Sequence, residues 1–234
     1  MAPDLVKVAA VIPAAGLSTR LTGDTKKQFR LLGEEPLLIH TLRRVMAADE
    51  IKIMAVAVPT GELTYVRELL QPIIPKDINI IVVAGGDSRQ ASVSAGLAAL
   101  PDNIDIIMVH DAVRPLLEPR WITATIALCR DYDGAIVAIP ATDTLKDIPP
   151  PAGGAAGQSR VISRTIPRES IWRAQTPQTF RADVLRRALA HAEQNGLTGT
   201  DEAELVEAIG GKIAVVEGSP HNIKVTTPED WHYL

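Results

Sequence analysis

The stretch Val6-Lys-Val-Ala-Ala-Val-Ile-Pro-Ala-Ala-Gly-Leu-Ser-Thr-Arg20 lies near the start of the 234-residue chain. Its first half, Val6–Ile12, is a β-branched run that is apolar at both odd and even positions, which is typical of a strand buried between two layers of helices. Its second half, Pro13–Arg20, begins with small residues, whose backbone N–H groups can approach a ligand closely. A buried strand that runs into such a loop favours an α/β fold.

Short β-branched runs and helical patterns alternate along the rest of the chain. Further strands are predicted at Ile53–Val58, Ile78–Val83, Ile104–Val109, Ala135–Ile139, Lys212–Val216 and Ile223–Val225. Helices are predicted at Leu37–Ala47, Leu63–Leu70, Arg89–Leu100, Arg120–Cys129, Ala182–Gln194 and Glu202–Ile209. This alternation predicts a single domain over residues 1–234, with a doubly wound, mostly parallel sheet and right-handed crossovers.

The composition excludes several classes of protein. Apolar residues make up 46% and charged residues 22%, which is typical of a folded globule rather than a disordered chain. A net charge of −4 and only 3% aromatic residues argue against nucleic-acid binding. No apolar run approaches the roughly 20 residues of a membrane span. The lone Cys129 excludes an internal disulfide, so we expect a cytoplasmic protein.

One segment, residues 142–168, interrupts the alternation. Its centre, Asp147–Gln158, is too rich in Pro and Gly for a helix, whereas Asp143–Ile148 and Arg160–Ile166 on either side have strand-like alternation. We therefore expect a protruding β-hairpin arm, and a second copy of the chain is the simplest partner for it. A disordered insertion is the alternative, which the functional residue types in its flanks disfavour.

The loop Pro13–Arg20 is a candidate phosphate site. It matches neither the Walker nor the Rossmann glycine pattern, but consecutive N–H groups at the carboxyl end of a strand can bind an anion. A simple strand-to-loop turn is equally compatible with the spacing. Arg20 and the nearby Lys26-Lys-Gln-Phe-Arg30 concentrate positive charge, which would suit a triphosphate, although charge runs are more commonly solvated surface.

Two further strand ends carry polar motifs. Ala84-Gly-Gly-Asp-Ser-Arg-Gln-Ala-Ser92 starts a helix, so Asp87 or Ser88 can be its cap and Ser92 either a base contact or a surface serine. In His110-Asp-Ala-Val-Arg-Pro115, Asp111 could meet a phosphate-bound Mg²⁺ or a sugar hydroxyl, and Arg114 could hold a phosphate or pair with Asp111.

The remaining polar segments supply cations and hydroxyls, but the sequence offers no Ser/His/Asp or Cys/His arrangement that would activate a nucleophile. They are Thr142-Asp-Thr144, Arg168, Gln175-Thr-Pro-Gln178, Thr200-Asp-Glu202 and Asn222-Ile-Lys-Val-Thr226. Lys224 lies in an apolar pattern, so it either extends to the surface or faces an anion. This inventory favours phosphoryl or nucleotidyl transfer, in which positioning and charge stabilisation do most of the catalysis.

Taken in order, these motifs resemble the 2-C-methyl-D-erythritol 4-phosphate cytidylyltransferases of the non-mevalonate isoprenoid pathway, from about Val8 to about Asp230. The resemblance rests on Pro13-Ala-Ala-Gly, Arg20, Lys27-Gln28, Ala84-Gly-Gly-Asp with Ser92, His110-Asp-Ala with Arg114-Pro115, Asp143-Thr-Leu-Lys146, Gln175-Thr-Pro-Gln178, Thr200-Asp-Glu-Ala203 and Asn222-Ile-Lys-Val225. It implies that CTP and methylerythritol phosphate react with Mg²⁺ present, bound mainly through the CTP phosphates, without a covalent enzyme intermediate.

The resemblance also implies roles for individual residues. Arg20, Lys27, Arg168 and Lys224 would be catalytic. The nucleotide would be enclosed by Ala14, Ala15, Gly16, Gly86, Asp87, Ser92 and Ala112. The acceptor would meet Asp111, Arg114, Thr144, Thr165, Arg168 and Thr200, with the arm of a homodimer completing the partner's site. Metal ligands remain unassigned.

Three alternatives differ in substrate or class. A ribitol-5-phosphate cytidylyltransferase shares the loop and the His110–Pro115 segment, but Ala141–Lys146 and Thr165–Arg168 look more like the methylerythritol enzymes. A sugar-1-phosphate nucleotidyltransferase usually has a longer acceptor domain than 234 residues allow. A non-catalytic nucleotide sensor would have no need of Arg20, Lys27 and Lys224 together.

Overall fold

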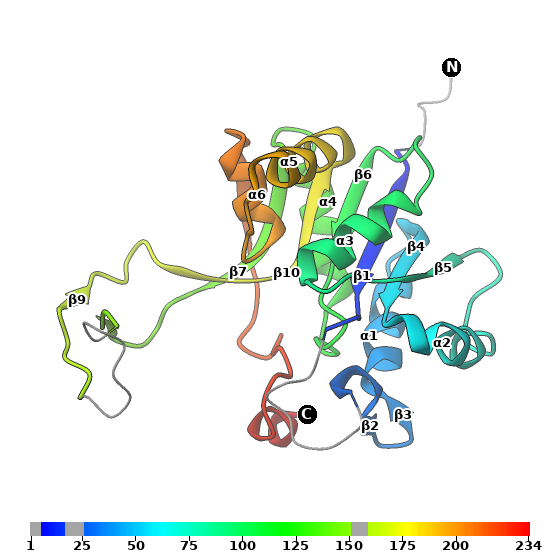
Figure 1. The fold of residues 1–234 in the computed structure, drawn as a ribbon, viewed down its shortest axis with the longest axis horizontal. Coiled ribbons are helices and arrows are strands. Elements are labelled where there is room, and N and C mark those ends of the chain that lie inside the picture. Colours follow the sequence, from blue (N-terminus) through cyan, green and yellow to red (C-terminus); the bar gives the residue numbers. More distant parts are fainter. Residues whose placement is uncertain (1–5, 17–25, 151–158) are drawn as a thin grey trace.

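The computed structural model describes residues 6–16, 26–150 and 159–234. Within them a seven-stranded sheet has the order β11-β7-β10-β6-β1-β4-β5 (Figure 1). The strands are β1 Val8–Pro13, β4 Ile51–Val58, β5 Asn79–Ala84, β6 Ile106–Val109, β7 Gly134–Pro140, β10 Trp172–Arg181 and β11 Ile213–Glu217. Two short hairpins pair β2 Leu31–Leu32 with β3 Glu35–Pro36, and β8 Leu145–Asp147 with β9 Arg164–Ile166.

The sheet is parallel except for β10, which runs antiparallel to both of its neighbours, β6 and β7. The doubly wound, mostly parallel α/β fold is thereby confirmed, and six of the seven predicted strands lie within two residues of their expected ends. The seventh, Ile223–Val225, is wrong. That segment is irregular, and the Val225 N–H donates to the carbonyl of Val113 instead of joining the sheet (2.9 Å).

Helices cover both faces of the sheet. The six α-helices of the described residues also end within two residues of prediction. They are α1 Leu37–Met46, α2 Leu63–Leu70, α3 Arg89–Ala98, α4 Pro119–Leu128, α5 Ala182–Asn195 and α6 Glu202–Ala208. Short 3₁₀ turns are η1 Lys27–Phe29, η2 Thr60–Glu62 and η3 Glu229–Tyr233.

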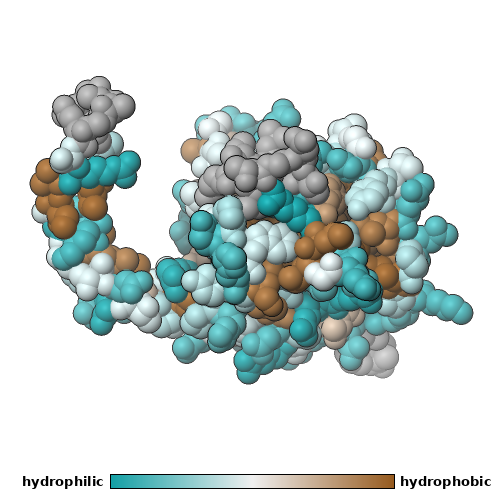
Figure 2. Space-filling view, turned by 90° about the horizontal axis from the view of Figure 1, so that it is seen from below, coloured by the Kyte–Doolittle hydropathy of each residue, from teal (hydrophilic) through white to brown (hydrophobic). Residues whose placement is uncertain are grey.

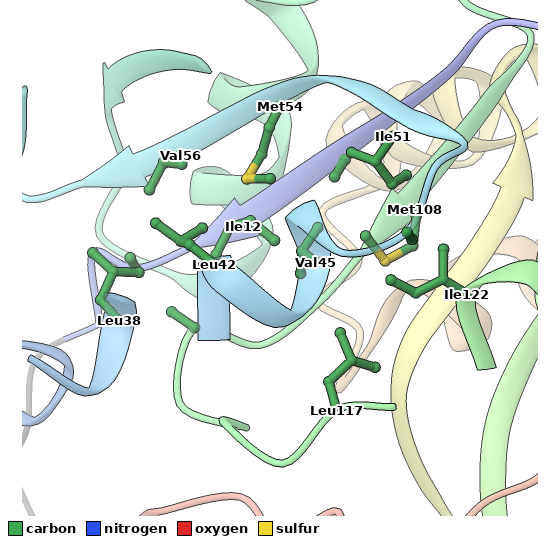
Figure 3. Packing of buried hydrophobic residues seen from close by; sticks show 14 of the residues in the cluster. Ile12, Leu38, Leu42, Val45, Ile51, Met54, Val56, Met108, Leu117 and Ile122 are labelled. Atoms are coloured by element: carbon green, nitrogen blue, oxygen red, sulfur yellow. The ribbon is translucent and has the colours of Figure 1, made fainter. Parts of the chain in front are cut away.

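Two apolar clusters lie on opposite faces because successive side chains of β1 point to opposite sides. Val8, Ala10 and Ile12 pack with α1, α2 and α4, as Figure 3 shows for Ile12 against Leu38 and Leu42. Ala9 and Val11 pack with α3, α5 and α6. This two-sided burial holds the carboxyl end of β1 in a fixed position beneath the site.

The pair β8–β9 lies away from the main sheet. Figure 1 shows it at the end of two extended segments, one that follows β7 and one that leads to β10. Figure 2 shows the projection as a separate column beside the body, with apolar atoms on its surface. Ile148, Val161 and Ile162 are exposed there. The expected Pro- and Gly-rich tip falls partly on residues 151–158, outside the described residues.

The C-terminal segment packs beside α1. Val225 joins Leu37 and Val113 in a small buried cluster, against which Trp231 and Leu234 pack. Among the helices that the described residues form, none is both long enough and apolar enough to span a bilayer.

Candidate active site

The strands β1 and β6 are neighbours, but the chain proceeds from β1 to β4 on one side and from β6 to β7 on the other. This switch point is where doubly wound sheets leave a crevice beyond the strand carboxyl ends. A pocket lies there, lined by Pro13, Ala14, Gly16, Lys27, Gln28, Arg89, Ser92, Asp111, Ala112, Val113, Lys224 and Thr226. A second, adjoining pocket is lined by Arg89, Asp111, Arg114, Ala174, Gln175, Thr176, Gln178, Thr200, Asp201 and Lys224.

Backbone hydrogen bonds fix the loop at the end of β1. The Ala14 N–H donates to the Ala57 carbonyl (2.7 Å), and the buried Gln28 side chain donates through Nε2 to the Ala14 carbonyl (2.6 Å). A Cβ on Gly85 would lie 2.4 Å from the Ala15 Cβ, so only glycine lets the end of β5 approach the loop this closely. The segment that follows β1 and the Ala84–Ser92 motif therefore meet in one pocket wall.

The start of α3 supplies the other side of this wall. The Ser88 hydroxyl caps α3 by accepting from the Ala91 N–H (3.0 Å), so Ser88 rather than Asp87 is the cap. The Ser92 hydroxyl donates to the Ser88 carbonyl (2.9 Å) and keeps its lone pairs for an incoming donor. Asp87 is exposed.

A buried carboxylate, Asp111, lies between the two pockets. Its oxygens lie 3.0 Å from Arg89 Nε, 3.1 Å from Arg114 Nε and 3.0 Å from Lys224 Nζ. Burial alone would raise the pKa of Asp111, but the charges of Arg89, Lys224 and Arg114 outweigh it and hold the pKa well below 3.8. Asp111 is therefore ionised and fixes three cations at the boundary of the pockets.

A second buried carboxylate, Glu202, holds the far side of Arg89. The Arg89 Nη1 lies 2.7 and 2.8 Å from the two Glu202 oxygens. Burial raises the pKa of Glu202, while the Arg89 charge opposes that rise. Burial lowers the pKa of Arg89, but the Asp111 and Glu202 charges dominate and raise it, so Arg89 stays charged.

His110 has a structural role. Its Nε2 lies 3.2 Å from the Arg114 carbonyl and therefore carries the proton, which leaves Nδ1 to accept from the Thr176 hydroxyl (2.9 Å). The Asp111 N–H donates in turn to the Thr176 oxygen (3.1 Å). Burial, opposed by the Asp111 charge, lowers the pKa of His110 to about 4, so the imidazole is neutral.

The irregular segment around Asn222 is tied to the same network. The Arg114 guanidinium donates to the Asn222 carbonyl (2.7 Å), and the Asn222 amide donates to the Thr176 carbonyl (2.9 Å). These bonds place Lys224, two residues further on, against Asp111. Lys224 was expected inside a strand, yet it reaches the site from an irregular segment that β10 and the residues after β6 hold in place.

The outer wall of the second pocket is the start of α6. Asp201 caps the helix by accepting from the Glu204 N–H (3.0 Å), and its other oxygen accepts from the Gln178 amide (2.8 Å). The exposed Thr200 donates its N–H and its hydroxyl to Glu204 (2.6 and 2.9 Å). Thr200 lies one residue before the cap and lines the second pocket.

The structure brings together only part of the predicted site. Lys27, Asp111, Arg114, Thr200 and Lys224 line one or both pockets. Four of the residues that were expected to enclose the nucleotide also line the first pocket: Ala14, Gly16, Ser92 and Ala112. Ala15, Gly86 and Asp87 are not among the described residues that line the first pocket. Arg20 lies outside the described residues.

Three of the predicted site residues belong to the arm 142–168 and lie away from both pockets. Thr144, Thr165 and Arg168 are exposed and line neither pocket in the described part of the chain. Thr165 accepts from the Lys146 ammonium (2.7 Å), and Arg168 donates to the Thr142 carbonyl. One copy of the chain therefore does not assemble the arm residues with Asp111.

Sequence reasoning assigned no role to Arg89, Gln28 or Glu202, although all three lie in the quoted motifs. Arg89 directly follows the Ser88 cap at a strand end, and this position could have indicated it. The burial of Glu202 depends on the contact between α6 and α3, which no local pattern reveals. Within the described residues no three His, Cys, Asp or Glu side chains gather as a metal site.

Comparisons with known proteins agree on one family. The model of the family described as "2-C-methyl-D-erythritol 4-phosphate cytidylyltransferase" matches residues 8–233. Proteins of that name from Acidobacterium capsulatum and Solibacter usitatus are 48% and 39% identical, each over 96% of this chain and 94% and 93% of their own lengths.

Solved structures extend the agreement. The 4-diphosphocytidyl-2C-methyl-D-erythritol synthase from Anaerococcus prevotii superimposes with a TM-score of 0.83 at 26% identity, covering 98% of this chain and 95% of that one. The 2-C-methyl-D-erythritol 4-phosphate cytidylyltransferase from Thermus thermophilus gives 0.74 at 32% identity, with 97% and 96% coverage. With its pockets at the switch point of the same sheet, the chain belongs to the 2-C-methyl-D-erythritol 4-phosphate cytidylyltransferase family.

Proposed function

We propose that this chain joins CTP and 2-C-methyl-D-erythritol 4-phosphate, giving 4-diphosphocytidyl-2-C-methyl-D-erythritol and pyrophosphate for isoprenoid precursors. Family membership over residues 8–233 supports this activity. The observation that carries the mechanism is the pair of adjoining pockets that share Arg89, Asp111 and Lys224. Two substrates bound side by side need such a shared boundary. The family match does not favour the ribitol-5-phosphate alternative.

The first pocket is proposed to hold CTP. Ala15 and Gly16 would present backbone N–H groups to the phosphates. Ala14 would fix their orientation, because its N–H donates to the Ala57 carbonyl and its carbonyl accepts from Gln28. Gly86, Asp87 and Ser92 would enclose the cytosine, and Ala112 the ribose side. Small residues dominate this wall, so recognition rests largely on the backbone.

The second pocket is proposed to hold the acceptor, whose phosphate oxygen attacks the CTP α-phosphorus in line. The bond from that phosphorus to the β-phosphate bridging oxygen breaks, and pyrophosphate leaves. Lys27, Lys224 and Arg20 would stabilise the charge on the equatorial oxygens in the transition state. Asp111 and Arg114 border the acceptor, with Thr200 on the outer wall.

Magnesium is proposed to enter with CTP. The described residues include no cluster of three metal-ligating side chains, and the Asp111 oxygens already have three cationic partners. This donor set fits an ion held mainly by CTP phosphates, with Asp111 as the one carboxylate that lines the first pocket among the described residues. When bound, the ion would neutralise charge on the phosphates and on the leaving pyrophosphate.

A homodimer through the arm 142–168 is proposed to complete each site. Thr144, Thr165 and Arg168 lie apart from the pockets of their own chain and carry the residue types that bind a polyol phosphate. A partner's arm would deliver them, with Arg168 on the acceptor phosphate. A cytoplasmic location is proposed with this biosynthetic role.

Pyrophosphate release from CTP tests the activity, with a panel of polyol phosphates as acceptors. We expect methylerythritol phosphate to be used most efficiently and release to require both the acceptor and Mg²⁺. Equal or better use of ribitol 5-phosphate would overturn the acceptor assignment. Release at the same rate without any acceptor would overturn the transfer itself.

A further inference from the structure

Glu202 is buried to a degree that helix formation does not require. It is the first residue of α6, yet the cap of that helix is Asp201, and Glu204 already accepts from Thr200. A carboxylate in a first turn is stabilised at the surface, whereas Glu202 is 1% exposed. Burying a charge costs free energy unless a partner compensates, and its partner is Arg89.

Arg89 lines both pockets, and a quarter of its side chain (26%) is exposed. Phosphates in either pocket would therefore meet a mobile guanidinium if nothing restrained it, because guanidinium binds phosphate through two parallel hydrogen bonds. In the structure its Nε faces Asp111 and its Nη1 faces Glu202, so carboxylates restrain it at two points.

We propose that Glu202 is a positioning residue that keeps the Arg89 guanidinium on Asp111 and off the substrate phosphates. The inference rests on the proposed function, since it concerns the phosphates of that reaction. Among the five charged side chains of this cluster, Arg89, Arg114 and Lys224 exceed Asp111 and Glu202 by one charge. Without the Glu202 charge the surplus doubles and Arg89 can turn toward an anion.

This restraint would act mainly on product release. Catalysis needs cations that bind the transition state better than the pyrophosphate product. An unrestrained Arg89 would hold the product as firmly as the transition state. By restraining Arg89, Glu202 would leave the phosphates to the cations that are proposed to stabilise the transition state.

The test substitution is Glu202→Gln, which keeps the shape and removes the charge. Pyrophosphate binding is measured by calorimetry with Mg²⁺ at fixed concentration, and pyrophosphate inhibition in the transfer assay. We expect the dissociation and inhibition constants to fall about three- to tenfold, because one more positive charge faces the anion. The value of kcat should fall as release slows. The control is Glu207→Gln, the same change on an exposed position of α6, which should leave both constants unchanged.

Two further variants separate restraint from packing. In Glu202→Gln/Arg89→Gln the tight pyrophosphate binding should disappear, because the freed guanidinium causes it. If Glu202→Gln fails to fold, Glu202→Asp retains the charge and should keep the affinity of the parent protein. Unchanged or weaker pyrophosphate binding by folded Glu202→Gln, or tight binding by Glu202→Asp, overturns the proposal. Binding needs no turnover, so a parent protein without transfer activity would refute the proposed function separately.

Discussion

His110 is enclosed on all sides, and its environment makes stability depend on pH. Its pKa falls from 6.5 to about 4 on folding, so the unfolded chain binds the proton more tightly. The stability that His110 contributes is therefore complete above pH 6.5 and is lost as pH falls toward 4. At 1.36 kcal/mol for each pH unit, the loss is about 3 kcal/mol.

We expect His110→Gln to reduce this pH dependence. Denaturant unfolding between pH 7 and 4 should show a shallower decline in the free energy of unfolding for the variant than for the parent protein. Asp111 does not confuse the comparison, because its lowered pKa places its own loss of stability below pH 3.8. An unchanged slope in His110→Gln would contradict the assignment of His110 as a buried neutral base.

Lys27 is proposed to matter most in the transition state. Lys27→Ala should lower kcat by about 10²–10³-fold, the usual cost of removing one charge-stabilising donor, with a smaller change in the KM for CTP. The neighbouring Lys26 pairs with Glu62 (2.9 Å) at a partly exposed position, so Lys26→Ala is the matched control and should retain most activity. Near-normal turnover of Lys27→Ala would rule out its catalytic role.

Sequence reasoning at the residue scale succeeded where a motif follows a strand. Asp111 could be anticipated because it stands at the end of an apolar run, and the carboxyl ends of parallel strands share one edge. Glu202 could not, because a carboxylate at the start of a helix is ordinarily an exposed favourable charge. Its burial as a partner of Arg89 comes from a long-range contact between the first residue of α6 and the first residue of α3.

At the scale of elements, α3 lies unusually close to β1. A Cβ on Gly96 would fall 2.6 Å from Val11 Cγ1, so a methyl group there must displace the helix or the valine. Gly96→Ala should lower the free energy of unfolding by about 1–3 kcal/mol despite the better helix propensity of alanine. Gly61→Ala in η2, where a Cβ meets nothing within 4 Å, should change stability by less than about 1 kcal/mol.

Denaturant titration of the two variants gives the comparison directly. Because Arg89 and Ser92 lie on α3, displacement of the helix by Gly96→Ala should also raise the KM for CTP. A variant with parental stability would mean that α3 moves freely over the sheet.

Among the strands of the main sheet, β10 is the one that the sequence did not predict. Its central residues Gln175-Thr-Pro-Gln178 lack apolar alternation and include a proline, which normally argues against a central strand. The strand accommodates this through a register shift opposite β7 between Ala174 and Gln178. The polar residues at the shift are those that line the second pocket, so functional residues broke the pattern that predicts strands.

At the scale of the molecule, the proposed dimer can be tested by mixing inactive variants. Arg168→Ala and Lys27→Ala should each lose activity alone. If a partner's arm completes each site, a mixed dimer contains one site with both residues intact. Random reassortment makes half of the dimers mixed, so activity should recover to roughly one quarter of the parent value.

Recovery is measured by pyrophosphate release after the variants are unfolded and refolded together. Each variant refolded with itself is the control and should remain inactive. Absence of recovery, with dimers demonstrated by light scattering, would contradict the exchange of arms between sites.

The place of β10 in the sheet also sets the order in which the protein can be built during synthesis. The neighbouring strands β6, β1, β4 and β5 are complete by residue 109. In the sheet they are joined to β7 and β11 by β10, which ends at residue 181. Until then a nascent chain carries β6 as an unpaired edge beside the unfinished acceptor pocket. A ribosome-bound chain that stops before residue 172 therefore exposes β6 as an edge strand that can pair with other chains. Chaperones should bind this species more strongly than longer nascent chains.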